Sequence, residues 1–141
     1  MTTTKDWGPK LWYSLHIITF NYPDNPTFSD KQNYENFFTS LQYVIPCSLC
    51  RQHYRDHLEK NPIKPHLENK ISLSKWLVEI HNEVNIMLGK PTLTFEEVVK
   101  LYSKTESNYY FKWIISITLL LISLFLIYKY CIKSSKKIYR Y

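Results

Sequence analysis

The sequence predicts an all-α protein: a four-helix bundle with a short fifth helix, followed by one C-terminal transmembrane helix. Helix-capping and helix-breaking residues recur along the first 105 residues, where strand patterns do not. Apolar residues make up 45% and charged residues 21% of the 141 residues, which excludes a disordered chain. The presence of only 2 glycines argues against a glycine-rich phosphate loop or a dinucleotide-binding fingerprint.

Capping residues delimit the five expected helices. Asp6 is expected to cap the first helix, and Ser29 or Asp30 the second. Pro46 separates the second helix from the third, because proline lacks the amide donor that a helix interior requires. Thr94 is expected to cap the fifth helix, with the acid of a capping box three residues later. The expected helices run from Trp7 to about Phe20, Lys31 to Tyr43, Cys47 to about Asn61, Ser72 to Gly89, and Thr94 to about residue 105.

The net charge of +6 lies entirely at the end of the chain. Residues 1–111 carry 12 basic and 12 acidic side chains, and the six excess basic residues follow with no acid among them. Trp113 to Tyr128 is an uncharged run flanked by Lys112 and Lys129, whose ammonium groups can reach lipid headgroups. Aromatic residues typical of the membrane interface lie at both ends of this run: Tyr109, Tyr110, Trp113, Tyr128 and Tyr130. We therefore expect a membrane anchor and no nucleic-acid site.

This pattern divides the chain into a helical domain over 1–105, a linker over 106–111, a transmembrane helix over 112–132 and a basic tail over 133–141. The positive-inside rule would place the tail in the cytoplasm. The first residues contain no apolar signal-peptide core, however, and a lone span near the C-terminus is the layout of a tail-anchored protein. We therefore expect a single-pass protein whose helical domain faces the cytoplasm. Cys131, which follows the uncharged run, is expected either to have no structural role or to be lipidated.

Cys47 and Cys50 form a C-x-x-C pair at the expected start of the third helix. Side chains three residues apart on a helix are neighbours, so the two sulfurs can form a disulfide. The unpaired amides and the positive end of the helix dipole favour a thiolate in the first turn, and Arg51 and His53 add donors of the same sign. This arrangement predicts a redox-active dithiol.

Three other interpretations of the cysteine pair remain open. Cys47, Cys50, His53 and His57 have the spacing of zinc ligands, but on one continuous helix they would extend over about 15 Å. A zinc site therefore requires this segment not to be helical. A thioredoxin-like motif would need flanking strands, for which there is no pattern. Two inert buried thiols are the third interpretation.

Polar and aromatic residues on two other helices suggest a cofactor site. Trp12 and His16 stand four residues apart on the first helix and share a face. His81, Asn82 and Asn85 lie on the fourth helix, away from its apolar stripe. Imidazole and amide groups in an aromatic-rich bundle can bind a planar cofactor between helices. Without the cysteines, a core histidine and solvated asparagines would be the simpler interpretation.

Together these residues resemble the Erv/ALR family of FAD-linked sulfhydryl oxidases. The shared motifs are W-x-x-x-H at Trp12 and His16, the Tyr22–Pro23 pair, C-x-x-C at Cys47 and Cys50, and HNEVNIMLGKP from His81 to Pro91. The resemblance extends from Trp7 to about Tyr102. It implies a helical bundle that holds FAD beside the cysteine pair. By motif position, the expected cofactor contacts are Gly8, Trp12, His16, Tyr22, His81, Asn82, Val84, Asn85, Leu88, Lys90 and Tyr102.

The resemblance also implies a mechanism and partners. A protein dithiol would attack Cys47, and Cys50 would pass the electrons to FAD and then to molecular oxygen, giving hydrogen peroxide. Family members are commonly homodimers. Many relatives carry a second cysteine pair as a shuttle, and the domain over 1–105 has only Cys47 and Cys50. A separate thioredoxin-like or other protein dithiol is therefore expected as the substrate.

Compact oxidases without a shuttle pair resemble those of large DNA viruses, which suggests a host or virion membrane as the location. The alternative function is a flavin-free, membrane-anchored dithiol relay or adaptor. The absence of bound flavin in the purified protein would favour that alternative.

Overall fold

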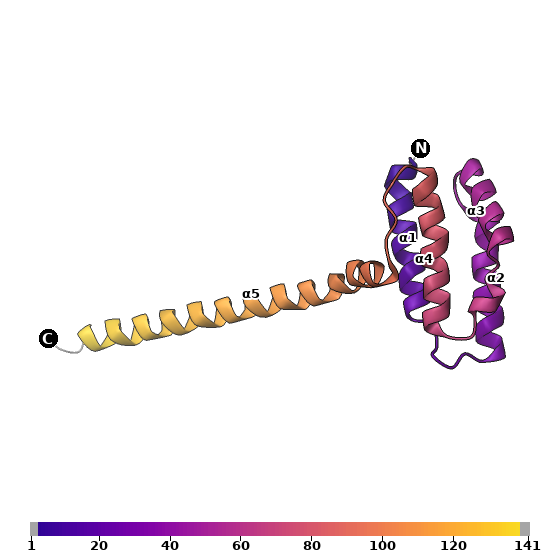
Figure 1. Cartoon of the computed structure of the whole chain (residues 1–141). Helices are drawn as coiled ribbons and strands as arrows, with labels where there is room; N and C mark the ends of the chain where they lie inside the picture. The colour runs from indigo at the N-terminus through magenta and orange to yellow at the C-terminus, as the bar shows by residue number, and fades with distance from the viewer. Residues whose placement is uncertain (1–2, 139–141) are drawn as a thin grey trace. The chain divides into compact units, whose positions relative to one another are not determined.

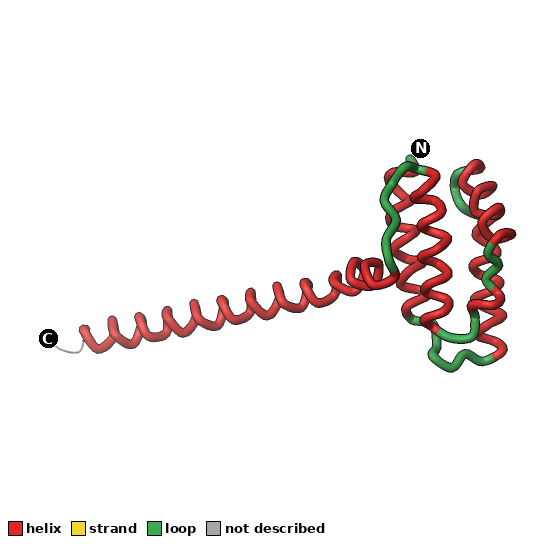
Figure 2. The backbone as a smooth tube through the Cα atoms, viewed as in Figure 1, coloured by secondary structure: helices red, strands yellow, loops and turns green. Residues whose placement is uncertain are grey.

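The computed structural model describes the backbone of residues 3–138 and the side chains of residues 3–102, 110–130 and 132. Every regular element in this part of the chain is a helix, which confirms the all-α fold class (Figures 1 and 2). Tyr109, Cys131 and the basic side chains from Lys133 onward, on which expectations were placed, lie outside the described side chains. The elements are α1 (Thr4–Phe20), α2 (Phe28–Val44), α3 (Ser48–Lys60), the short 3-10 helix η1 (Lys64–His66), α4 (Lys70–Met87) and α5 (Phe95–Ile138).

The chain forms two units, Met1–Tyr102 and Ser103–Tyr141. In the first unit α1 packs against α4, α2 packs against α3, and α3 also contacts α4. Figure 1 shows these four helices lying roughly side by side as a bundle. The element order therefore brings the first and fourth helices together, which carry the expected cofactor residues.

The first two helices begin one turn earlier than the sequence analysis expected. Thr3 is the N-cap of α1 and Thr27 is the N-cap of α2. Asp6 and Asp30 occupy the third helical position instead, where each carboxylate accepts the backbone N–H of its threonine at 2.8 Å. The predicted caps at Asp6 and at Ser29 or Asp30 were wrong, because these motifs are capping boxes that use aspartate as the reciprocal acid.

The other helix ends are set by side chains close to the expected positions. Asn69 caps α4 by accepting the N–H of Ser72 at 2.9 Å, so this helix begins at Lys70 and not at Ser72. Gly89, with φ of +63°, ends α4 in the left-handed conformation that glycine adopts without steric cost. The expected capping box of α5 is present: Thr94 N–H donates to Glu97, and the Glu97 N–H donates to the Thr94 hydroxyl.

Large aromatic side chains fill the core of the first unit. Three of them donate a hydrogen bond from their polar atom to a backbone carbonyl. The Tyr22 hydroxyl donates to Leu67 O at 2.9 Å, and the Trp76 indole donates to Asn61 O at 2.9 Å. The Tyr54 hydroxyl donates to Phe38 O at 3.0 Å, which links α3 to α2. Burial raises the pKa of Tyr54 above its usual range. These bonds fix the position of α3 along the axis of the bundle, and therefore the position of its cysteines.

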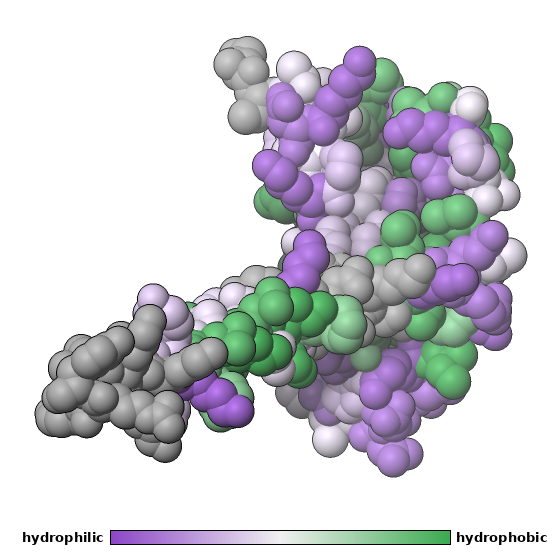
Figure 3. Space-filling model, turned by 90° about the vertical axis from the view of Figure 1, so that its left-hand side faces the viewer, coloured by the Kyte–Doolittle hydropathy of each residue, from purple (hydrophilic) through white to green (hydrophobic). Residues whose placement is uncertain are grey.

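The second unit consists of the remainder of α5. Its segment Tyr110–Tyr130 has 21 residues and a mean hydropathy of 2.1, and none of it is buried. At 1.5 Å per residue it is about 30 Å long, close to the thickness of a bilayer core. Figure 3 shows hydrophobic side chains gathered along this helix. The hydroxyls of Thr118 and Ser123 donate to carbonyls in their own helix, at 2.8 and 2.7 Å, so these groups are satisfied without water.

The expected fifth helix and the apolar helix are a single assigned element. Residues 106–111, expected as a linker, are helical backbone within α5. The segment between the two parts contains no proline or glycine, so nothing in it forces the helix to end.

Candidate redox site

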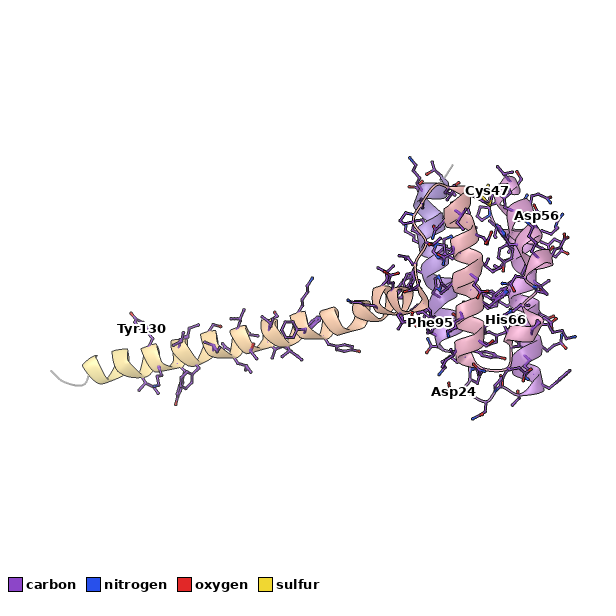
Figure 4. All side chains as sticks on the ribbon, in the orientation of Figure 1. Asp24, Cys47, Asp56, His66, Phe95 and Tyr130 are labelled. Atoms are coloured by element: carbon purple, nitrogen blue, oxygen red, sulfur yellow. A yellow bond between two sulfur atoms is a disulfide. The ribbon has the colours of Figure 1, made fainter. Side chains whose placement is uncertain are left out.

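Cys47 and Cys50 are joined by a disulfide, with their Cα atoms 5.1 Å apart. This separation lies within the usual range for disulfide-bonded cysteines. Cys47 is the N-cap of α3, and its sulfur accepts the backbone N–H of Cys50 at 3.1 Å. Figure 4 shows Cys47 at one end of the bundle. A sulfur at this position lies at the positive end of the helix dipole, which stabilises a thiolate when the bridge opens.

The two cysteines have different neighbours. Cys50 packs against the hydrophobic core, whereas Cys47 is flanked in sequence by the exposed residues Pro46 and Ser48. The Arg51 guanidinium donates to Ile45 O at 2.7 Å, and the Arg51 N–H donates to Cys47 O at 3.0 Å. Arg51 therefore fixes the bend of the chain before Cys47. From the sequence it was expected only to add positive charge near the cysteines.

The zinc interpretation does not fit this segment. It required the chain from Cys47 to His57 not to be helical, and α3 is a regular helix from Ser48 onward. In the described part of the chain, no three His, Cys, Asp or Glu side chains gather as a metal site.

The structure brings His16 of α1 and His81 of α4 into contact. His16 Nε2 and His81 Nδ1 lie 3.0 Å apart, which is a hydrogen bond whose donor depends on the tautomers. The Trp12 ring stacks on His81, with centroids 4.0 Å apart and planes 6° apart. The Tyr102 ring stacks on His16, with centroids 5.0 Å apart. Four of the expected cofactor residues, from three helices, therefore form one aromatic cluster, which we call the imidazole stack.

Both histidines of the imidazole stack are held neutral. Burial, and secondarily the neighbouring His81, lowers the pKa of His16 to about 3. Burial, and secondarily the charge of Lys90, lowers the pKa of His81 to about 4. His16 is fully buried, and its Nδ1 atom has no hydrogen-bond partner among the described residues. An orphaned buried nitrogen beside stacked rings fits a site that a polar, planar ligand completes.

Three more of the expected cofactor residues follow His81 on one face of α4. Val84, Asn85 and Leu88 follow His81 at intervals of three, four and seven residues, so they share a helix face. The side-chain amide of Asn85 makes no hydrogen bond to another described residue. The backbone N–H of Lys90 donates to Asn85 O at 2.8 Å, a bond that closes the helix end around Gly89. Lys90 is exposed, as a phosphate-binding ammonium would need to be.

Three of the predicted cofactor residues have structural partners of their own. The Asn82 amide donates to Leu93 O at 2.8 Å and accepts the Leu93 N–H at 3.0 Å, so it ties the loop after α4 back to the helix. Tyr22 is fully buried and packs against Tyr34, and a cofactor contact would require this packing to change. Gly8 is buried in α1, where an added Cβ would meet only ordinary van der Waals contact.

The sequence analysis weighed His57 only as a zinc ligand. In the structure His57 is buried on α3, and no described residue forms a hydrogen bond with its Nε2. Burial lowers its pKa, and the charge of Glu83 on α4 opposes that effect. The helical spacing of three, four and seven residues from Cys50 to His53, Tyr54 and His57 was the available signal for an inward-facing histidine.

Comparison with known proteins places this geometry in context. The family model described as the Erv1 / Alr family matches residues 9–104. A protein of Acanthamoeba polyphaga mimivirus, named as a probable FAD-linked sulfhydryl oxidase, is 42% identical over 102 residues, which is 72% of this chain and 71% of that protein. The FAD-linked sulfhydryl oxidase of an African swine fever virus isolate from Malawi is 30% identical over 102 residues, covering 72% of this chain and 84% of the viral protein.

Solved structures with this fold are also known. The crystal structure of the yeast Erv1 core aligns with a TM-score of 0.69 at 26% identity, over 74% of this chain and 87% of that one. The crystal structure of the FAD binding domain of Erv1 from Saccharomyces cerevisiae aligns with a TM-score of 0.68 at 26% identity, over 74% of this chain and 97% of that one.

Proposed function

This chain belongs to the Erv1/Alr family, and from that premise we propose that it is a FAD-linked sulfhydryl oxidase that introduces disulfides into protein dithiols. The observation that carries the proposal is the Cys47–Cys50 disulfide at the N-terminus of α3. In the same bundle, His16 of α1 and His81 of α4 belong to the neutral imidazole stack. The two viral relatives are named as FAD-linked sulfhydryl oxidases, and the yeast structure is described as a FAD binding domain.

The thiol chemistry follows from the two sulfur environments. A substrate thiolate attacks the Cys47 sulfur, a new substrate–Cys47 disulfide forms, and the Cys47–Cys50 bond breaks with its electron pair on Cys50. A second substrate thiolate then attacks the substrate sulfur and releases Cys47 as a thiolate. The substrate dithiol has lost two electrons and two protons, and the cysteine pair has gained the two electrons. The helix N-terminus stabilises the thiolates that form.

Residues of α1, α4 and the start of α5 would hold the cofactor. Trp12, His81 and Tyr102 offer ring faces, and His16 Nδ1 and the Asn85 amide offer polar atoms without partners of their own in the described structure. Lys90 offers an exposed ammonium for the phosphates. FAD, when bound, supplies a two-electron acceptor that molecular oxygen reoxidises with release of hydrogen peroxide.

The test is the colour and the oxygen uptake of the purified full chain in detergent micelles. It should carry flavin, absorb in the visible range, and consume oxygen when given dithiothreitol. A colourless preparation with both cysteines intact and no oxygen uptake would contradict the proposal and favour the flavin-free relay or adaptor.

We further propose that Tyr110–Tyr130 anchors the protein in a membrane, with the domain over 1–105 on the cytoplasmic side and the basic residues over 133–141 as the flanking tail. The length and hydropathy of this segment support the anchor. The side of the membrane on which the domain lies is part of this proposal. Protease treatment of intact membranes tests it, since a cytoplasmic domain is digested and a luminal one is protected. We also propose a host or virion membrane as the location and a homodimer as the assembly, as the family resemblance implies.

A further inference from the structure

We propose that Tyr43, Val44 and Leu49 form a docking surface that selects a protein dithiol with an apolar side chain next to its reacting cysteine. This inference rests on the proposed thiol oxidase function and names the substrate class of the same site. We call these three residues the apolar rim. Tyr43 and Val44 are the last two residues of α2, just before the cysteine pair, and Leu49 lies between the two cysteines.

The exposure of the apolar rim is the first observation. Tyr43, Val44 and Leu49 are 67%, 66% and 62% exposed, although each is large enough to fill a core position. Single exposed apolar residues are common on protein surfaces, but three within seven residues of chain are a local concentration. Val44 and Cys47 are three residues apart, so their Cα atoms lie within about 11 Å.

The direction of attack on the disulfide is the second observation. A thiolate attacks a disulfide sulfur from the side opposite the bond that breaks. Since Cys50 packs against the core, attack on Cys47 comes from outside the bundle, where Pro46 and Ser48 are exposed. Residues next to the attacking cysteine extend about 3.5 Å per residue, so the first two on either side reach the apolar rim.

The charge around the pair is the third observation. Residues 36–55 contain no Asp or Glu, and their only formal charges are those of Arg51 and Arg55. Arg51 donates to a backbone carbonyl, and Arg55 donates to the Gln42 side chain at 3.3 Å. No carboxylate within this segment repels an incoming thiolate. The surface therefore accepts a thiolate carried on an apolar segment, which is the chemistry of the proposed substrate.

The test compares two reduced C-x-x-C peptides of equal charge, one with Leu and Phe beside the cysteines and one with Ser and Gly there. The enzyme is the full, flavin-loaded chain in micelles, and dithiothreitol is the small substrate that cannot reach the rim. We expect kcat/KM to favour the apolar peptide about tenfold, the size expected for burying about one large side chain. The double variant Tyr43→Ser/Val44→Ser should reduce this preference to about twofold, with dithiothreitol oxidation unchanged.

A matched control removes exposed apolar side chains from the other ends of helices. Phe28 begins α2 and Ile71 lies in the first turn of α4, and they are 83% and 57% exposed. The variant Phe28→Ser/Ile71→Ser should keep the full preference. All the enzymes are assayed with the same peptides and micelles, so partition of the apolar peptide into micelles cannot explain a loss of preference confined to the rim variant. The inference is overturned if the wild type shows no preference or if the rim variant keeps the preference. It is also overturned if the rim variant oxidises dithiothreitol as much more slowly as it oxidises the apolar peptide. A wild type that oxidises no dithiothreitol contradicts the proposed function itself.

Discussion

His16 and His81, separated by 65 residues in the chain, share one hydrogen bond of 3.0 Å between two neutral imidazole rings. The bond joins α1 to α4 at the centre of the imidazole stack. It requires that one ring donate and the other accept, and protonation of both rings would leave two donors facing each other.

The first prediction concerns pH. Folding lowers the pKa of His16 to about 3 and of His81 to about 4, while an unfolded histidine titrates near 6.5. The unfolded state therefore binds more protons below pH 6.5, and the unfolding free energy falls as the pH drops from 6.5 toward 4. The slope is about 1.4 kcal/mol per pH unit for each histidine. Denaturant titrations of the full chain at pH 7, 5.5 and 4.5 measure it. The variant His16→Gln should show a smaller slope.

The second prediction concerns cofactor retention. His81→Ala and Asn85→Ala each remove a polar side chain from the α4 face that we assign to FAD. We expect both variants to lose flavin during gel filtration and to show a lower Tm, since a ligand that binds only the folded state stabilises it. Asn36→Ala removes an exposed amide from α2 and should retain flavin fully. Equal flavin loss in Asn36→Ala would mean that the assay reports general destabilisation and not the site.

The third prediction separates chemistry from cofactor binding. Cys50→Ala removes the sulfur that packs against the core and leaves Cys47 at the helix N-terminus. Turnover with dithiothreitol should fall to the background rate, because no disulfide can re-form, while the visible flavin spectrum persists. Ser48→Ala, between the two cysteines, should retain turnover. Substantial oxygen uptake by Cys50→Ala would remove the cysteine pair from the proposed mechanism.

The fourth prediction concerns the loop after α4. Asn82→Ala leaves the Leu93 N–H and C=O groups without their side-chain partner, which we expect to cost about 2 kcal/mol of unfolding free energy. Asn82→Asp keeps the acceptor for the Leu93 N–H and should lose less. Urea titration of the three proteins gives the order wild type, Asn82→Asp, Asn82→Ala. Equal stability of Asn82→Ala and wild type would show that water replaces both bonds without cost.

The fifth prediction concerns the anchor. Leu120→Arg places a charge at the middle of Tyr110–Tyr130, which costs about 3 kcal/mol in a bilayer centre. We expect more of the variant than of the wild type to be released from membranes by alkaline extraction. Leu101→Arg, at an exposed position before this segment, should extract like the wild type. Release of all three proteins to the same extent would contradict a spanning helix.

Helix types and their order could be predicted from the sequence, because proline and capping residues mark the boundaries locally. The first-turn error at Asp6 and Asp30 arose since aspartate is common both as an N-cap and as the acid of a capping box, and the preceding threonine decides between them. The cysteine pair could also be predicted, because its chemistry depends on neighbours in one helix turn.

Contacts between distant segments could not be predicted from residue spacing. Nothing local to His16 indicates that His81 lies 3.0 Å away; helix faces and the family resemblance suggested a shared cofactor site but no contact between the two rings. The amide of Asn82 could equally bind a ligand or a loop, and the structure shows it on the backbone of Leu93. Such bonds depend on how helices pack, which local propensity does not determine.

The cysteines that react are only three residues apart, and they lie where a helix begins. In the chain-entropy model a bridge across a 15-residue loop contributes about 3 kcal/mol, and a shorter loop contributes less. In this model, opening a bridge between residues three positions apart removes less stability than opening a long-range bridge would. The oxidised and reduced proteins can share one scaffold, so each turnover changes the state of two sulfur atoms without unfolding and refolding the rest.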